Sequence, residues 1–192
     1  ASLELSTLDG TTGFRLDGID AGDWAGYSVR GAGDVNGDGY DDLLIGARAA
    51  DGGGNTDAGE TYVVFGKASG FTAALALSSL DGSSGIRLDG IDASDLSGLA
   101  VDAAGDVNGD GFDDLVIGAV YGDPGGNASA GESYVVFGGD FTHTVTHLGS
   151  SAADTLTGTS GANVMVGGLD DDTIVGAGGA DVLRGGAGDD IL

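Results

Sequence analysis

One long segment occurs twice in this chain, and the second copy begins 72 positions after the first. Residues 3–66 align with residues 75–138, and 43 of the 64 aligned positions are identical. Self-similarity at a fixed period marks a repeat architecture, in which each copy is one supersecondary unit that packs against its neighbour. Both copies are therefore expected to fold in the same way.

Each copy has the local pattern of short strands. The candidates in the first copy are residues 14–19, 26–32, 42–47 and 60–66, which are separated by glycine-rich loops. Residues 5–8 (LSTL) are expected to be extended as well, and no segment keeps a helical period. Tandem units of four short antiparallel strands are typical of propeller blades. The sequence thus predicts an all-β fold with two blade-like units.

After residue 138 the period changes to nine. Residues 149–192 divide into five glycine-rich turns with a polar residue at the sixth place and an apolar residue at the eighth. This pattern predicts a short parallel β-roll. The expected organisation is a first unit at 1–72, a second unit at 73–140, a connecting strand or linker at 141–148 and the roll at 149–192. The sixth-place residues are Asp154, Asn163, Asp172, Asp181 and Asp190.

The charge balance restricts the partners of this chain. It has 31 acidic against 6 basic residues, a formal net charge of −25 and no cysteine. Such a polyanion repels phosphate backbones and anionic headgroups, so nucleic-acid binding is not expected. No apolar stretch is long enough for membrane insertion, and disulfides are impossible. Cations are the natural partners.

The string DVNGDG[YF]DD occurs at residues 34–42 and again at 106–114. Oxygen-bearing side chains at alternate positions converge on one hard cation when the backbone turns tightly, as glycine permits. Oxygen-only ligands favour Ca²⁺ over zinc, which prefers Cys or His. We therefore expect one Ca²⁺ in each loop. The predicted ligands are Asp34, Asn36, Asp38, the carbonyl of Tyr40 and Asp42, and then Asp106, Asn108, Asp110, the carbonyl of Phe112 and Asp114.

The same loops have two other interpretations. An EF-hand begins in the same way but needs a bidentate Glu at its twelfth place and a helix on either side. The twelfth places here are Ile45 and Ile117, and the flanking residues have strand character. The second alternative is an acidic, solvated turn that binds no metal.

The repeated unit resembles the FG-GAP repeat of integrin α-subunit propellers and their bacterial relatives. Residues 25–29 (AGYSV) resemble its opening segment, the aspartate loop resembles its Ca²⁺ loop, and residues 45–48 (IGAR) resemble its closing segment. The resemblance implies propeller blades that make extracellular protein or glycan contacts. Because a propeller needs about four to eight blades, either this chain is a fragment or other chains supply the missing edges. Strands shared between the two copies are also expected.

Residues 149–192 resemble the RTX, or haemolysin-type, repeat GGxGxDxUx. That resemblance implies Ca²⁺ held by aspartates of stacked turns, with partners two nonapeptides apart, and export from a bacterium by type I secretion. A flexible Gly/Asp linker is the alternative. The ligands implied are Asp154, Asp172, Asp181 and Asp190, with Asn163 facing Asp181.

No catalytic constellation is visible, and no enzyme is expected. The strings G-x-S-x-G, H-E-x-x-H and the P-loop are absent from the sequence. His143 and His147 lie four apart in a strand-like segment and lack a third ligand nearby in sequence. Trp24 and Tyr27 are expected to pack inside the first blade.

These observations predict a noncatalytic, calcium-binding module of a secreted or surface-exposed bacterial protein. It would present metal-stapled β-structure for adhesion or assembly. Its expected partners are Ca²⁺, a surface protein or glycan, and a second copy of the chain through open blade edges. Two alternatives are a calcium-dependent filament or surface-layer subunit, and the accessory region of an exported hydrolase.

Overall fold

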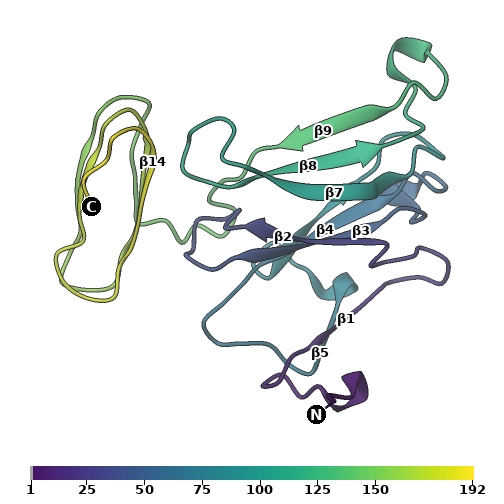
Figure 1. Cartoon of the computed structure of the whole chain (residues 1–192), viewed down its shortest axis with the longest axis horizontal. Coiled ribbons are helices and arrows are strands. Elements are labelled where there is room, and N and C mark those ends of the chain that lie inside the picture. The colour runs from purple at the N-terminus through teal and green to yellow at the C-terminus, as the bar shows by residue number, and fades with distance from the viewer. Residues whose placement is uncertain (1) are drawn as a thin grey trace. The chain divides into compact units, whose positions relative to one another are not determined.

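The structure is a computed structural model that describes residues 2–192. Figure 1 shows strands joined by loops, and every helix within the described residues is a short 3₁₀ segment. The segment at residues 5–8 forms such a turn rather than the expected extended strand. It does so because both the amide and the hydroxyl of Thr7 donate to the carbonyl of Glu4, at 2.9 and 2.7 Å. The turns are η1 (Leu5–Thr7), η2 (Gly52–Gly54), η3 (Leu77–Ser79) and η4 (Pro124–Gly126).

The chain forms two compact units that alternate along the sequence. One unit contains Ala1–Arg30, Leu43–Asp102 and Ile117–Tyr134, and the other contains Gly31–Asp42, Ala103–Val116 and Val135–Leu192. Both aspartate loops therefore belong to the same unit as the nonapeptide segment.

The first sheet has four strands in the order β2-β3-β4-β6. Antiparallel pairing places Ile45 of β3 opposite Tyr62 of β4, and Tyr62 opposite Arg87 of β6. By sequence, β6 lies in the second repeat. The expectation that strands are shared between repeats is therefore confirmed. The strands are β2 (Ser28–Gly33), β3 (Asp42–Ala47), β4 (Glu60–Val64) and β6 (Gly85–Asp89).

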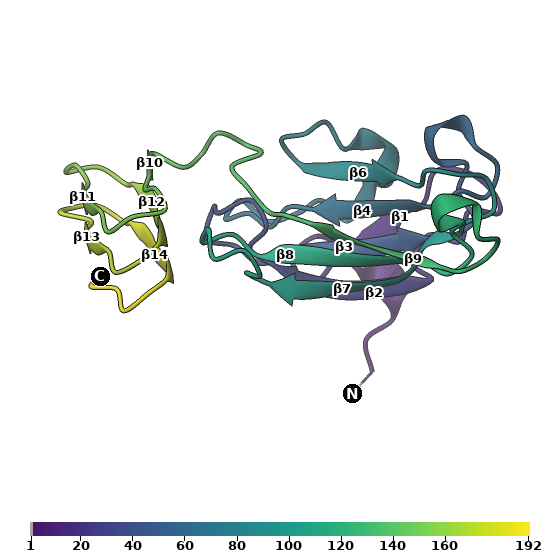
Figure 2. The same cartoon turned by 90° about the horizontal axis from the view of Figure 1, so that it is seen from above.

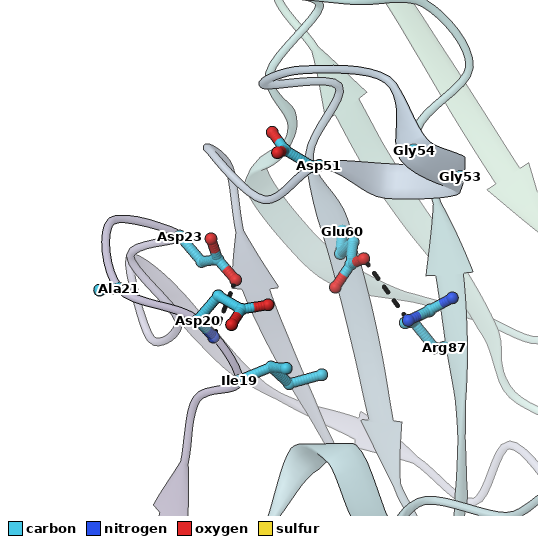
Figure 3. Close-up of a pocket in the computed structure, with 9 residues that line it drawn as sticks. All are labelled: Ile19, Asp20, Ala21, Asp23, Asp51, Gly53, Gly54, Glu60 and Arg87. Atoms are coloured by element: carbon cyan, nitrogen blue, oxygen red, sulfur yellow. Dashed lines mark hydrogen bonds and ion pairs between the residues drawn. The ribbon is translucent and has the colours of Figure 1, made fainter.

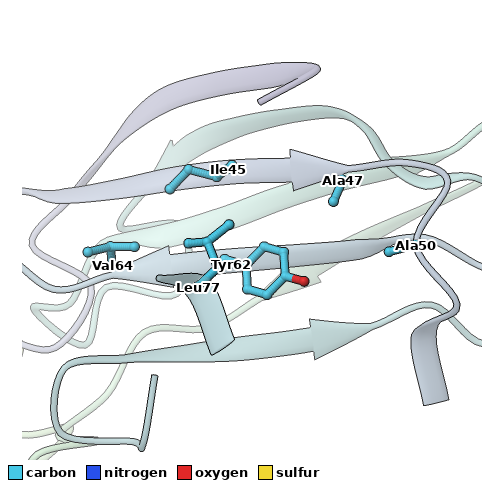
Figure 4. Close-up of a cluster of buried hydrophobic side chains, with 6 residues drawn as sticks. All are labelled: Ile45, Ala47, Ala50, Tyr62, Val64 and Leu77. Atoms are coloured by element: carbon cyan, nitrogen blue, oxygen red, sulfur yellow. The ribbon is translucent and has the colours of Figure 1, made fainter. Parts of the chain in front are cut away.

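A second shared pairing joins the repeats. β1 (Arg15–Asp17) lies parallel to β5 (Ala74–Ala76), with Leu16 opposite Leu75. These leucines pack against a cluster of buried side chains from β3, β4, η3 and the turn after β3. Figure 4 shows the buried members of this cluster. Burial of each large aliphatic or aromatic side chain contributes roughly 1.5–3 kcal/mol. The buried members of the cluster are Ile45, Ala47, Ala50, Tyr62, Val64 and Leu77.

The second sheet has three strands in the order β7-β8-β9. They are β7 (Ser97–Gly105), β8 (Asp114–Ala119) and β9 (Glu132–Val136). Four strands were expected. The first sheet takes its fourth strand from the following repeat, whereas the second repeat is followed by the nonapeptide segment. The second sheet therefore has three strands, because no following repeat supplies a fourth.

Residues 147–192 form a parallel roll, and Figure 2 shows its short strands following one another around the coil. Its sheets have the orders β10-β12-β14 and β11-β13. Paired residues lie two nonapeptides apart, as in Met165 with Leu183 and Leu156 with Ile174. Met165 and Ile174 are buried in the core. The strands are β10 (His147–Leu148), β11 (Thr155–Thr157), β12 (Val164–Leu169), β13 (Thr173–Val175) and β14 (Val182–Ala187).

Candidate calcium sites

The first aspartate loop connects β2 to β3 and is closed by its own side chains. Asp34 accepts the amides of Asp38 through Oδ1 at 3.0 Å and of Gly39 through Oδ2 at 2.7 Å. Asn36 Oδ1 accepts the Asp38 amide at 2.9 Å. Gly39 has φ +91°, a conformation that other residues rarely adopt. Alternate oxygen-bearing side chains therefore curl around one tight turn. Asp38 Oδ1 accepts the Tyr40 amide at 3.0 Å, and Asp42 Oδ2 accepts the Val35 amide at 2.9 Å.

The second loop, between β7 and β8, repeats this geometry. Asp106 Oδ1 accepts the Asp110 amide at 3.1 Å, and Asp106 Oδ2 accepts the Gly111 amide at 2.8 Å. Asn108 Oδ1 accepts the Asp110 amide at 3.1 Å. Two near-identical sequences thus give the same arrangement. Asp110 Oδ1 accepts the Phe112 amide at 3.0 Å, and Asp114 Oδ2 accepts the Val107 amide at 2.8 Å.

Asp113 links the two loops, although the sequence did not single it out. Its Oδ2 accepts the amide of Asp34 at 2.8 Å, and its own amide donates to the carbonyl of Asp34 at 3.2 Å. Asp114 Oδ1 accepts the amide of Gly138 at 2.9 Å, so the segment after β9 is tied to the second loop as well. The loops therefore form one hydrogen-bonded assembly.

Several of these polar groups are buried. Asp34, Asn36, Asp42 and Asp114 are each at most 2% exposed. Burial raises the pKa of Asp34, and the nearby Arg184 guanidinium opposes part of that rise. A carboxylate withdrawn from water in this way is stabilised by a cation beside it.

The donor set fits Ca²⁺. Within residues 2–192, no three His, Cys, Asp or Glu side chains are gathered into a metal cage, because the loop carboxylates point at backbone amides. They are nevertheless oxygen donors on glycine turns, which is the chemistry that Ca²⁺ selects. When bound, the ion would neutralise carboxylates that otherwise repel one another. The residues that would hold it are the predicted sets from Asp34 to Asp42 and from Asp106 to Asp114.

In the roll, the sixth-place residues form two ladders. Asp172 Oδ1 accepts the amide of Asp154 at 2.7 Å, and Asp190 Oδ1 accepts the amide of Asp172 at 2.9 Å. On the second ladder, Asp181 Oδ1 accepts the amide of Asn163 at 2.9 Å. These are the pairs expected for turns on the same side of the roll.

Asp172 carries the most direct indication of a cation site. It is 1% exposed, and its Oδ2 is buried without a hydrogen-bond partner among the described residues. An unpartnered buried carboxylate oxygen costs several kilocalories unless an ion or hydrogen bond compensates it. The roll therefore also fits Ca²⁺, on the ladder of Asp154, Asp172 and Asp190.

The two histidines do not share a strand. His143 lies in a turn with φ +56°, whereas His147 begins β10 and its Nδ1 is 3.0 Å from the hydroxyl of Thr146. The segment predicted to be strand-like is therefore extended only at its end.

A cavity of about 410 Å³ opens beside the first sheet (Figure 3). Four carboxylates line it, those of Asp20, Asp23, Asp51 and Glu60. Arg87 Nη1 lies 3.6 Å from Glu60 Oε1, so one of the four is paired. No motif in the sequence singled out this cavity, because its residues come from four separate segments.

Trp24 and Tyr27 are 58% and 51% exposed, so the expectation that they pack inside the blade is wrong. The Arg48 guanidinium covers both rings, at 4.7 Å from the centroid of Trp24 and 4.5 Å from that of Tyr27. Trp24 has φ +62°, a backbone conformation that side-chain-bearing residues rarely adopt. We call these three residues the aromatic platform. The corresponding residues of the second copy are Leu96, Leu99 and Val120.

Comparison with known families agrees with this geometry. The family model of the FG-GAP repeat matches residues 25–64 and 97–136. That of the RTX calcium-binding nonapeptide repeat matches residues 148–183 and 167–192. The chain thus carries FG-GAP repeats followed by RTX repeats, and it is a calcium-binding module of β-structure.

The chain is similar to integrin alpha-PS2 of Drosophila melanogaster. The two are 38% identical over 117 residues, which cover 59% of this chain and 8% of that protein. The chain therefore spans less than a tenth of the length of this relative. Among the described residues, no helix is long and apolar enough to cross a bilayer.

Proposed function

We propose that this chain is a noncatalytic module of a secreted or surface-exposed bacterial protein, which becomes rigid when it binds Ca²⁺ outside the cell. The observation that carries the proposal is the buried, unpartnered Oδ2 of Asp172, together with two loops of buried oxygen donors. FG-GAP and RTX repeats in one chain support the same function.

The physical basis is charge. With a net charge of −25, folding brings carboxylates together in a compact state that repels itself. A cation that binds only the folded state converts its binding energy into folding energy. Extracellular Ca²⁺ modules typically have dissociation constants of about 10⁻⁴–10⁻³ M. Such a chain stays loosely folded where calcium is scarce and folds after export.

The aromatic platform supports a role in adhesion, with a glycan as the ligand. Exposed aromatic rings offer flat apolar faces on which a sugar ring stacks, and polar groups beside them fix its orientation. Asp23, which lines the acidic cavity, directly precedes Trp24 in the chain. The carboxylates of the cavity would accept hydrogen bonds from sugar hydroxyls.

Circular dichroism and light scattering in millimolar Ca²⁺, and again after excess chelator, test the proposal. We expect a reversible, partial loss of β-signal on chelation, which Mg²⁺ at the same concentration does not restore. Unchanged spectra would refute it. An increase of scattering with Ca²⁺ alone would instead favour a self-assembling filament subunit.

A further inference from the structure

Arg184 of β14 reaches from the roll into the first aspartate loop. Its Nη1 lies 3.4 Å from Asp34 Oδ2 and donates to the carbonyls of Asp34 at 3.2 Å and Gly111 at 3.1 Å. Its Nη2 lies 3.5 Å from Asp113 Oδ2. A guanidinium that is 27% exposed thus occupies the point at which the two loops meet.

The contact is part of a wider packing of the roll on the glycine turns of both loops. A Cβ placed on Gly39 would lie 2.8 Å from a methyl carbon of Val182, and one on Gly111 would lie 2.4 Å from a methyl carbon of Val166. Val166 of β12 is the register partner of Arg184. Neighbouring positions on one face of the roll therefore present an apolar side chain to the second loop and a cation to the first.

The loops differ in this respect, although their ligand residues are the same. Asp34 has Arg184 beside it, whereas within residues 2–192 no Lys, Arg or His lies within 4 Å of the carboxylates of Asp106, Asp110 and Asp114. The guanidinium thus touches a ligand carboxylate of the first loop but only a backbone carbonyl, that of Gly111, in the second.

We propose that Arg184 sets the calcium affinity of the first loop, acting as a built-in cation that competes with Ca²⁺ for the charge of Asp34. The two loops then fill at different calcium concentrations, and filling of the first loop weakens its contact with the roll. This proposal rests on the calcium binding proposed above.

Electrostatics determines the direction of the effect. Asp34 Oδ2 faces Arg184 and Gly39, so a Ca²⁺ ion held by Asp34 lies close to the guanidinium. Like charges at such separations repel strongly even at an effective dielectric constant of about 20. We expect the affinity of the first loop to be about tenfold lower than that of the second. Because coupling is reciprocal, Ca²⁺ weakens the Arg184 contact by the same factor.

The test uses the full chain in two backgrounds. Asp110→Asn disables the second loop and leaves the first, and Asp38→Asn does the reverse. Calorimetric titration with Ca²⁺ gives a calcium affinity in each background, and Asp172→Asn is added to both backgrounds so that the roll contributes little to the heat. Arg184→Gln is then added to both. A matched control is Arg15→Gln, which removes one charge from an exposed side chain that pairs with Asp17.

We expect Arg184→Gln to tighten Ca²⁺ binding about tenfold in the Asp110→Asn background and to leave it unchanged in the Asp38→Asn background. Arg184→Lys keeps the charge and should keep the lower affinity. Arg184→Gln should lower the unfolding midpoint more in calcium-free buffer than in saturating calcium. Without calcium, Arg184 is the cation beside Asp34, and its removal leaves that carboxylate without one. Circular dichroism of each variant verifies that the roll remains folded.

Equal affinities of the two loops, or weaker binding after Arg184→Gln, would overturn the proposal while leaving the calcium function intact. Absence of Ca²⁺ binding in both backgrounds would overturn both. If Arg184→Gln unfolds the roll, Arg184→Lys is used in its place. A tenfold gain in the calcium affinity of the first loop in Arg184→Lys would contradict the role of charge.

Discussion

The amide of Asp154 donates a 2.7 Å hydrogen bond to Oδ1 of Asp172, while Oδ2 of the same carboxylate is buried without a partner among the described residues. One oxygen thus holds two turns of the roll together and the other is free to bind an ion. The structural role of this residue and its proposed metal-binding role can therefore be separated by mutation.

Asp172→Asn should weaken calcium binding by the roll without breaking the ladder. Asn keeps an oxygen for the amide of Asp154 but replaces the unpartnered oxygen by an NH₂ group. We expect about a tenfold loss of affinity, or about 1.4 kcal/mol, measured by calorimetric titration. Asp170→Asn is the control, since Asp170 lies two positions away and outside the sixth-place ladder. Equal losses in both variants would contradict a specific role for Asp172.

Asp114 should matter for folding even without calcium. It accepts the amides of Val107 and Gly138 at 2.8 and 2.9 Å and is fully buried. Asp114→Ala removes the acceptor of two part-buried hydrogen bonds, which costs up to about 1–3 kcal/mol each. Urea unfolding in chelator should show this loss. Asp110→Asn serves as the comparison and should reduce stability only in calcium; an equal loss in chelator would refute this division of roles.

The two Glu–Tyr pairs should make stability sensitive to alkaline pH. The hydroxyls of Tyr62 and Tyr134 donate to Glu60 and Glu132, respectively. Burial, with the carboxylate beside it, raises the pKa of Tyr134 to about 12 and raises that of Tyr62 as well. Because the folded-state pKa exceeds the usual value near 10, this stabilisation is complete below pH 10 and is lost as pH rises towards 12.

A spectrophotometric titration of the tyrosinates measures this effect. Glu132→Gln should lower the pKa of Tyr134 towards 10. If Tyr134 ionised at an ordinary pH in the folded wild-type chain, the contact would have no energetic consequence.

Trp24→Ala should abolish glycan binding and leave the calcium response intact. Trp24 is largely exposed, so little core packing is lost, and the unfolding midpoint should change little. Binding to a glycan array, with Tyr121→Ala as the exposed aromatic control, measures the effect. Retained glycan binding by the Trp24 variant would show that the aromatic platform is not the binding surface. If the chain bound protein ligands but no glycan, the proposed glycan ligand would be wrong.

Local patterns predicted the repeating parts of the molecule well. Alternating oxygens around Gly39 and Gly111 were enough to foresee the turns, and the nonapeptide period fixed the partner of Asp172 in the roll. Because the two copies have nearly the same local sequence, they adopt the same local structure, and each copy supports the prediction made for the other.

Long-range contacts could not be predicted in the same way. Arg184 occupies a variable place in its nonapeptide, and Asp34 lies 150 residues earlier. Trp24 and Tyr27 are residue types that are often buried, and they are exposed here because of their positions in the fold. The second sheet has three strands because the nonapeptide segment, and not another repeat, follows it in the chain. No pattern within the repeat itself contains that information.

The place of β6 has a practical consequence for anyone who divides this chain. The repeat visible in the sequence ends near residue 72, yet β4 forms its outer pairing with Gly85–Asp89. Fragments cut at the sequence boundary therefore deprive the upstream sheet of a strand, whereas a fragment that extends past Asp89 keeps it. During synthesis, likewise, the first sheet is complete only once part of the second repeat has left the ribosome, so successive repeats finish one another in order.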